Sequence, residues 1–281
     1  NVWHGDHQWH QYSSEFANQL EKHCDKSGIP FFCDVANIKE ITTEEKARDW
    51  RYKKLSMKVE EFLKKENSTN NWYILTGHTS TDNTETFLLN LARGSYFNGL
   101  SGIPKQRLLN NKYALRRPIL IFSRKETAEI CKDMQIPFWE DPTNFDLSIK
   151  RNVIRHKVLP YLDEMYPGYT NRINHFIGKM NHYKNEQADL SQLALKSCKD
   201  SNGIKREIFN TLGKEAKSTI LHTYIKEKYT KQIDSQNIET ISLAISSKSS
   251  GQINLSSTLK IMWNKNTISL TSIADFFQNT N

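Results

Sequence analysis

Short apolar runs alternate with amphipathic helical segments over the first half of this chain. Apolar residues spaced three and four apart predict helices at residues 13–27, 43–65, 81–93 and 123–134. Between these segments lie compact apolar runs at residues 30–35, 72–76 and 118–122. Strands that alternate with helices favour an α/β fold built on a parallel sheet. Functional side chains in such sheets gather beyond the carboxyl ends of the strands, and Asp34 and His78 follow two of the predicted strands.

Local signals place the ends of two of these helices. Ser13 or Ser14 is the expected N-cap of the first helix, and Gly28 is its expected stop. Ser123 and Glu126 have the spacing of a capping box at the start of the fourth helix. The residues 67–71 predict a polar turn.

The pattern changes near Arg151. Residues 151–228 are mostly helical, whereas residues 250–271 alternate around a polar turn and predict a β-hairpin. A chain of 281 residues is long enough for two domains. We therefore expect one α/β domain over residues 1–155 and a mainly helical domain, with a small terminal hairpin, over residues 156–281.

The chain is basic, with a formal net charge of +8 at pH 7 and a pI of about 9.1. A basic surface attracts polyanions, above all nucleic acid, although a charged surface that only maintains solubility explains the same balance equally well. The four cysteines form no CxxC pair, which argues against a metal or disulfide framework. No apolar run approaches the roughly 20 residues that cross a bilayer, so we expect no membrane segment.

One segment concentrates groups that can do chemistry. His78 ends a predicted strand, and Asp82 and Glu85 share one face of the helix that follows. Carboxylates in a first helical turn are favoured by the helix dipole, and a pair of them can bind Mg²⁺ or a substrate ammonium group. Spacing alone favours a simpler interpretation, in which the acids are ordinary N-terminal helix charges and His78 is a loop residue.

Six motifs occur in a fixed order over residues 3–160. The most specific is His78-x-x-x-Asp82-x-x-Glu85-Thr86, which is followed by Arg93-Gly94 and Gly99-Leu100-Ser101-Gly102. The others are Asp6-His7-Gln8-Trp9, Ala47-Arg48-x-x-Arg51-Tyr52, Arg117-Pro118-Ile119-Leu120, Glu140-Asp141-Pro142-Thr143-Asn144 and Arg151-Asn152-x-x-Arg155-His156. Together they resemble the tRNA(Ile)-lysidine synthetases of the PP-loop ATPase superfamily, in which the Arg117 motif is a strand. The Asp6-His7-Gln8-Trp9 motif, with its tryptophan, resembles that of the cyanobacterial and plastid members.

The resemblance implies an adenine nucleotide α-hydrolase-like (PP-loop) fold and a ligase that forms a carbon–nitrogen bond. In that family ATP adenylates the C2 oxygen of the wobble cytidine in an isoleucine tRNA with a CAU anticodon. Free L-lysine then attacks C2 and releases AMP, which changes decoding from AUG to AUA. By this resemblance Asp82, Glu85 and His78 are the catalytic candidates. Asp82 and Glu85 would bind lysine or Mg²⁺, and Asp82 would assist the deprotonation of lysine.

The resemblance also implies binding residues for the two larger substrates. The candidates for contact with ATP are Asp6, His7, Arg48 and Arg51. The candidates for contact with tRNA are Arg93, Arg151, Arg155 and Lys157. For the arginines the alternative is a solvated surface or an ion pair with Glu140 or Asp141.

The family binds pyrophosphate with a Ser-Gly-Gly-x-Asp-Ser string, which does not occur in residues 1–281. In that family the string belongs to a strand, loop and helix of roughly 30 to 40 residues that precede the Asp6 motif. We expect either that the chain is truncated or that it cannot bind ATP unaided. Two alternatives stay open: a tRNA-binding relative without catalysis, and another PP-loop tRNA-modifying enzyme such as a thiolase, which the scattered cysteines disfavour.

The chain has 28 lysines and 25 asparagines but only 11 arginines, a bias that AT-rich codons produce. This bias and the Asp6-His7-Gln8-Trp9 motif indicate a protein of the plastid (chloroplast) stroma. The bacterial cytoplasm is the alternative.

Overall fold

The computed structural model describes residues 1–39, 41–66, 72–95, 97–109, 113–228 and 234–272. The chain forms two compact units, Asn1–Met180 and Asn181–Asn281. The turn predicted at residues 67–71 lies outside the described residues. Among the helices of the described ranges, none has both the length and the apolar character needed to cross a membrane.

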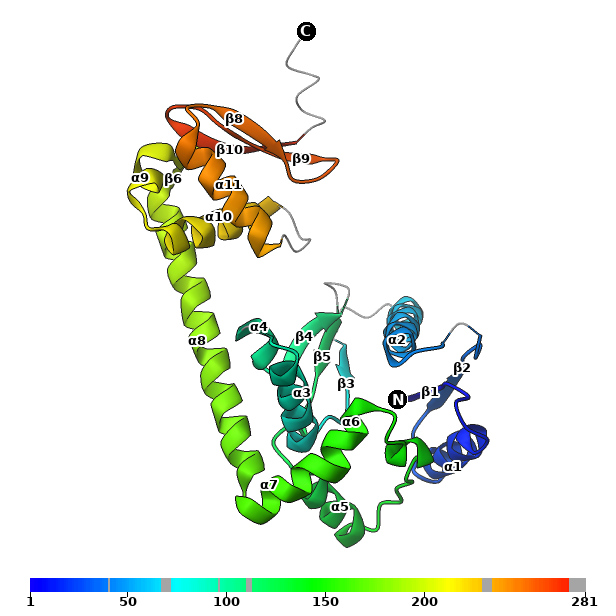
Figure 1. The fold of residues 1–281 in the computed structure, drawn as a ribbon. Helices are drawn as coiled ribbons and strands as arrows, with labels where there is room; N and C mark the ends of the chain where they lie inside the picture. Colours follow the sequence, from blue (N-terminus) through cyan, green and yellow to red (C-terminus); the bar gives the residue numbers. More distant parts are fainter. Residues whose placement is uncertain (40, 67–71, 96, 110–112, 229–233, 273–281) are drawn as a thin grey trace. The chain divides into compact units, whose positions relative to one another are not determined.

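The first unit begins with two parallel strands and their helices (Figure 1). These elements are β1 (Val2–Asp6), α1 (Ser13–Lys26), β2 (Phe31–Val35) and α2 (Glu44–Glu66). Strand β1 pairs with β2 in parallel, with Val2 opposite Phe31 and Asp6 opposite Val35. The chain leaves α1 through Gly28 at φ +64°, a conformation that glycine adopts without steric cost, which confirms the predicted stop.

The start of α1 differs from the prediction. Tyr12 is the N-cap residue and makes no side-chain cap hydrogen bond. Ser14 lies inside the helix, where its hydroxyl instead donates to the Asp6 carboxylate at 3.1 Å. The Ser14 hydroxyl, a predicted cap, therefore binds the last residue of β1 instead of capping α1.

The next sheet has three strands in the order β3-β5-β4, formed by β3 (Tyr73–Leu75), β4 (Gln106–Leu109) and β5 (Tyr113–Arg116). Strand β5 pairs in parallel with β3 and antiparallel with β4. The strand expected at residues 118–122 is wrong, since the observed strand β5 lies just before these residues. Proline has no N–H to donate to a ladder, and from Pro118 the chain forms turns instead, with Leu120 N–H donating to Arg117 O at 3.3 Å.

Helices surround this sheet (Figure 1). Helix α3 (Ser80–Ala92) contacts α4 (Phe97–Leu100), α5 (Arg124–Asp133), α6 (Lys150–Val153) and the π-helical turn η2 (Ile154–Val158). The 3₁₀ turn η1 (Pro142–Phe145) precedes α6, and α7 (Leu159–Met165) follows η2. Helix α5 begins with the predicted Ser123–Glu126 capping box, and α3 begins with a second capping box between Thr79 and Asp82.

The boundary between the compact units falls at Met180, further along the chain than residue 155, where the sequence analysis placed it. The first turns of the long helix α8 (Tyr169–Cys198) are fastened to α3. The Asn174 amide donates to Ser80 O and to Thr84 Oγ1, both at 3.0 Å, and accepts from Asn83 at 2.7 Å. Side-chain hydrogen bonds between residues about ninety positions apart thus extend the first unit.

The second unit packs helices against an antiparallel sheet. The helices are α9 (Arg206–Thr211), α10 (Lys214–Lys228) and α11 (Ser235–Ser247). The sheet order is β6-β7-β10-β9-β8, from β6 (Lys199–Asp200), β7 (Gly203–Lys205), β8 (Gly251–Asn254), β9 (Leu259–Trp263) and β10 (Thr267–Ser272). The predicted terminal hairpin is confirmed as β9–β10, within a larger sheet. Its core contains fully buried residues from both layers, among them Phe209, Leu221, Ile245, Ile261 and Ile268.

A buried arginine joins the layers of this unit. The Arg206 guanidinium donates to the carbonyl oxygens of Ile245, Lys248, Ser249 and Asn264, where α11 ends and β9 turns into β10. Helix ends leave carbonyl groups without partners, and this side chain satisfies them. Arg206 is therefore a structural residue of the second unit.

Candidate active site

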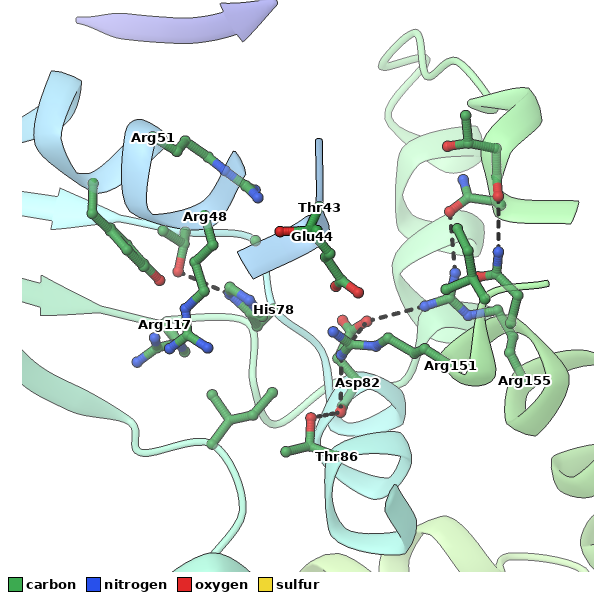
Figure 2. A pocket seen from close by; sticks show the side chains of 18 of the residues that line it. Thr43, Glu44, Arg48, Arg51, His78, Asp82, Thr86, Arg117, Arg151 and Arg155 are labelled. Atoms are coloured by element: carbon green, nitrogen blue, oxygen red, sulfur yellow. Dashed lines mark hydrogen bonds and ion pairs between the residues drawn. The ribbon is translucent and has the colours of Figure 1, made fainter. Parts of the chain in front are cut away.

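A cleft of about 1210 Å³ opens in the first unit, beside the ends of two parallel strands. Thr76, Gly77 and His78 follow β3 and line one part of it, and Arg117 follows β5. Helix α2, the start of α3 and the segment from η1 to η2 supply most of the other walls (Figure 2). The cleft therefore lies where ligands bind in open parallel sheets, as the sequence analysis expected.

The cleft is lined by arginine and by no described lysine. Seven of the chain's 11 arginines contribute to its walls: Arg48, Arg51, Arg107, Arg117, Arg124, Arg151 and Arg155. The guanidinium group binds phosphate and carboxylate oxygens through paired hydrogen bonds, which an ammonium group cannot reproduce. The composition of the sequence carries a signal for these residues. In a chain with 28 lysines, each arginine is a departure from the compositional bias.

Asp82 lies at the start of α3 and points into the cleft. Its Oδ2 accepts from the Thr79 N–H and hydroxyl groups, both at 2.8 Å. Its Oδ1 lies 3.3 Å from Arg124 and 3.5 Å from Arg151 and Arg155. Burial alone would raise the pKa of Asp82, but the hydrogen bonds from Thr79 and the arginine charges outweigh it and lower the pKa. Asp82 is therefore a stable carboxylate with three cations around it.

Glu85 faces the arginines rather than the cleft. It is 0% exposed, and it is not among the described lining residues. Arg155 donates to both of its oxygens, from Nε to Oε1 at 2.6 Å and from Nη2 to Oε2 at 2.9 Å. Arg151 Nε also donates to Oε2, at 2.7 Å. Glu85 thus fixes two arginines whose outer atoms reach Asp82.

His78 lies between two groups of charges (Figure 2). Arg48 and Arg117 lie on one side of it, and Asp82 and Arg151 lie on the other. Its Nδ1 is 3.0 Å from Thr76 Oγ1. Burial, followed by the positive charge of Arg117, lowers the pKa of His78 to about 4. The imidazole is therefore neutral near pH 7 and can accept a hydrogen bond.

Not every predicted binding residue reaches the cleft. Arg48 and Arg51 line it, as does Trp9, whereas Asp6, His7, Arg93 and Lys157 are not among its described lining residues. Asp6 is buried and accepts from Gln8 N–H at 2.8 Å, so it shapes the loop after β1.

The remaining three residues lie elsewhere on the first unit. The His7 ring lies 5.3 Å from the rings of both Trp9 and Trp50. Arg93 and Lys157 are exposed, at the end of α3 and in η2 respectively.

The arginines of the η1–η2 segment do not pair with the acids suggested as an alternative. Asp141 caps η1, where it accepts from Thr143 N–H at 2.8 Å, and it lies 3.3 Å from His10. Arg151 and Arg155 pair with Glu85 and Asp82 instead. The alternative interpretation of these arginines, as solvated or paired with Glu140 or Asp141, is therefore wrong for Arg151 and Arg155.

The donor set around Asp82 does not fit a Mg²⁺ ion held by the protein. Mg²⁺ needs oxygen ligands, and within the described ranges no three His, Cys, Asp or Glu residues are grouped to hold a metal. The free oxygen of Asp82 already faces three guanidinium groups, which repel a second cation.

These features define an α/β domain with an arginine-lined cleft at its strand ends, and comparison with known proteins narrows the class. Residues 1–162 match the family model of the PP-loop domain. Over 270 residues the chain is 53% identical to the tRNA(Ile)-lysidine synthase of Prochlorococcus marinus subsp. pastoris, covering 96% of this chain and 80% of that protein.

One further relative and one solved structure are also similar to this chain. The chain is 34% identical over 166 residues to the chloroplastic tRNA(Ile)-lysidine synthase of Pyropia yezoensis, covering 58% of this chain and 47% of that one. It also aligns with the solved U34-tRNA thiolase NcsA of Methanococcus maripaludis, at 13% identity and a TM-score of 0.49, over 64% of this chain and 61% of that one.

The identity over nearly the whole chain is decisive. The chain belongs to the tRNA(Ile)-lysidine synthase family of PP-loop proteins.

Proposed function

We propose that the protein ligates lysine to C2 of the wobble cytidine in an isoleucine tRNA with a CAU anticodon, at the expense of ATP. The observation that carries the proposal is a neutral histidine and an ionised aspartate in one arginine-lined cleft. The family's relatives over nearly the full chain support this function over a thiolase, as do four cysteines that are all free and scattered.

The arginines suit the phosphate chemistry of the first step. The cytidine C2 oxygen attacks the α-phosphorus of ATP, and pyrophosphate leaves. Negative charge develops on the phosphate oxygens, and preorganised cations in a cleft stabilise that charge. Arg48 and Arg51 on α2 line the cleft, and Trp9, Ile38 and Ile41 add apolar surface that suits a base. Mg²⁺ would enter with the phosphates of ATP rather than on Asp82.

The arginines around Asp82 suit the second step. The ε-amine of lysine must lose a proton before it attacks C2 and expels AMP. A cation-rich site disfavours an ammonium ion, so the field of Arg124, Arg151 and Arg155 lowers the pKa of an incoming amine. Asp82 would orient the amine through its Oδ1, neutral His78 would accept a hydrogen bond from it, and the proton would leave to solvent.

Glu85, which was predicted to bind lysine or Mg²⁺, is proposed to have a different role. Because both of its oxygens bind Arg151 and Arg155, it acts as a positioning residue that holds these guanidinium groups beside Asp82. Removing it would displace the arginines and the charge balance around Asp82. Arg93 and Lys157, which are exposed outside the cleft, are proposed to contact the tRNA backbone.

We place the protein in the bacterial cytoplasm or the plastid stroma. The higher identity to the Prochlorococcus marinus relative supports the former, and the chloroplastic relative from Pyropia yezoensis supports the latter.

The test is lysidine formation by the product of the complete open reading frame that encodes residues 1–281. The protein is incubated with CAU-anticodon isoleucine tRNA, ATP, Mg²⁺ and labelled lysine, and digested nucleosides are analysed by mass spectrometry. The expected result is lysidine that depends on both ATP and lysine. A protein that binds the tRNA but forms no lysidine and exchanges no pyrophosphate would be a non-catalytic relative, and the proposal would be wrong.

A further inference from the structure

Three arginines surround one tyrosine on the wall of the cleft formed by α2, β4 and the end of β5. We call this set, Arg48, Arg107, Arg117 and Tyr52, the Tyr52 cluster. The guanidinium carbon of Arg107 lies 4.5 Å from the centre of the Tyr52 ring, and that of Arg48 lies 5.7 Å from it. Arg117 is held beside β4, since its N–H donates to Lys105 O at 3.0 Å. Arg107, Arg117 and Tyr52 were not among the residues predicted from the sequence to bind a substrate.

The cluster has buried donors without acceptors. Arg117 is only 6% exposed, and its Nη1 donates to Pro104 O at 2.6 Å. Its Nε has no hydrogen-bond partner within the described part of the chain, nor do Nε and Nη2 of Arg107, which are also buried. Buried donors in folded proteins are nearly always satisfied, so unpaired ones that line a cleft indicate an acceptor that arrives with a ligand.

The charge of the cluster is also uncompensated. No carboxylate of the described ranges forms an ion pair with Arg48, Arg107 or Arg117, in contrast to Arg151 and Arg155. Burial lowers the pKa of Arg117, and the neighbouring charges of Arg107 and Arg48 lower it further, while Tyr52, through its hydroxyl group, offsets part of this effect. A ligand that relieves both the repulsion and the unpaired donors needs negative charge and several oxygens. A phosphate group has both.

We propose that the Tyr52 cluster binds one phosphate oxyanion of a substrate, with Arg107 and Arg117 as the principal donors. The proposal rests on the proposed function, because ATP and tRNA are the substrates that carry phosphate. His78 lies between Arg117 and Asp82 (Figure 2), so the phosphate would be held on the opposite side of the imidazole from the carboxylate that meets lysine. The cluster would thereby set the direction in which the substrate enters the cleft.

The experiment uses four single variants of the complete protein. Arg107→Gln and Arg117→Gln remove donors, and Tyr52→Phe removes only the hydroxyl group that lies among them. Arg116→Gln is the matched control, because Arg116 adjoins Arg117 in the chain but is exposed and donates to Gln106 at 3.0 Å outside the cleft. Affinity for ATP is measured by calorimetry. Affinity for a CAU anticodon stem-loop RNA is measured between 50 and 200 mM salt, the range in which phosphate contacts are most visible.

The expected result is a loss of about 10- to 100-fold in affinity for one of the two ligands in the two arginine variants. Tyr52→Phe should lose about 3-fold, and the control should lose less than about 2-fold. If the phosphate belongs to RNA, the slope of log affinity against log salt falls by about one unit in Arg107→Gln. If it belongs to ATP, the RNA slope stays unchanged and only ATP binding weakens.

Unchanged affinity for both ligands in variants that melt as the wild type does would overturn the proposal. If Arg117→Gln does not fold, Arg107→Gln and Tyr52→Phe decide by the same criteria. Lysidine formation is measured in the same wild-type preparation. If the wild type forms lysidine and the variants bind both ligands normally, only the role of the Tyr52 cluster is refuted. If the arginine variants lose affinity but the wild type forms no lysidine, only the proposed function is refuted.

Discussion

Replacing Glu85 by glutamine removes one negative charge from a fully buried site while keeping the size and shape of the side chain. The carboxylate accepts three short hydrogen bonds, at 2.6, 2.7 and 2.9 Å, from Arg155 and Arg151. Glutamine has one acceptor oxygen, and its NH₂ group must face a guanidinium N–H. The variant therefore loses hydrogen bonds and leaves two cations beside each other with only the more distant carboxylate of Asp82, at 3.5 Å, as a counterion.

The size of the effect follows from the burial of these groups. Breaking a buried ion pair by removing one partner costs about 3 to 5 kcal/mol. The side chains of Arg151 and Arg155 are 26% and 12% exposed, so water partly replaces the lost carboxylate and the lower limit of about 3 kcal/mol applies. For a unit of this size, 1 kcal/mol corresponds to about 2 to 4 °C in Tm, so a decrease of about 6 to 12 °C is expected.

The assay is thermal unfolding by calorimetry, in which the transition of the first unit is followed. Two carboxylates serve as controls. Glu186→Gln alters an exposed pair with His182 in the second unit and should leave the Tm of the first unit unchanged to within about 1 °C. Asp82→Asn keeps an oxygen for the two Thr79 donors and should cost about 1 kcal/mol. If Glu85→Gln melts no lower than the Glu186 control, the buried pair does not anchor Arg151 and Arg155, and the positioning role of Glu85 is wrong.

Four further outcomes are expected. Asp82→Ala should abolish lysine transfer and leave tRNA affinity nearly intact; a parallel loss of tRNA affinity, measured by filter binding, contradicts its role. The His78 ring should titrate with a midpoint near 4 by NMR, and because this folded pKa lies below the unfolded value of about 6.5, its contribution to stability falls as the pH drops from about 6.5 to 4; a midpoint near 6.5 contradicts the site's electrostatics. The affinity for tRNA should fall steeply with salt, and a flat response in the same binding assay refutes a basic binding surface. Arg206→Lys should destabilise the second unit by about 2 to 4 kcal/mol, since one ammonium group cannot reach four carbonyl oxygens; an unchanged urea midpoint argues against its structural role.

Local patterns predicted most of the helices and their ends. The apolar spacing of residues 13–27 and the glycine after it are signals within one segment, and α1 ends where they place it. The Ser123–Glu126 capping box is also local, and it is present. The strand before Arg117 was misplaced, because an apolar run of five residues does not reveal which stretch finds a partner. Pairing with β3 and β4 places the strand at Tyr113–Arg116.

In the candidate site too, local motifs predicted some residues, whereas contacts between distant parts of the chain were not predicted. His78 and Asp82 were found from a motif within one strand and helix, and both line the cleft. Glu85 shares that motif, but its partners are 66 and 70 residues away, so its burial among arginines was not foreseen. The Tyr52 cluster was also missed, since α2, β4 and the end of β5 meet only in the folded chain.

By itself, the amino-acid sequence determined the class of fold, the alternation of its elements and the family, because periodicity, caps and motifs are properties of neighbouring residues. Only the tertiary structure decided which charges compensate each other. Arg151 and Arg155 found a buried carboxylate, whereas Arg107 and Arg117 found none. The energy of a charge depends on its burial and on its distance from other charges, and both are properties of the folded chain rather than of sequence separation.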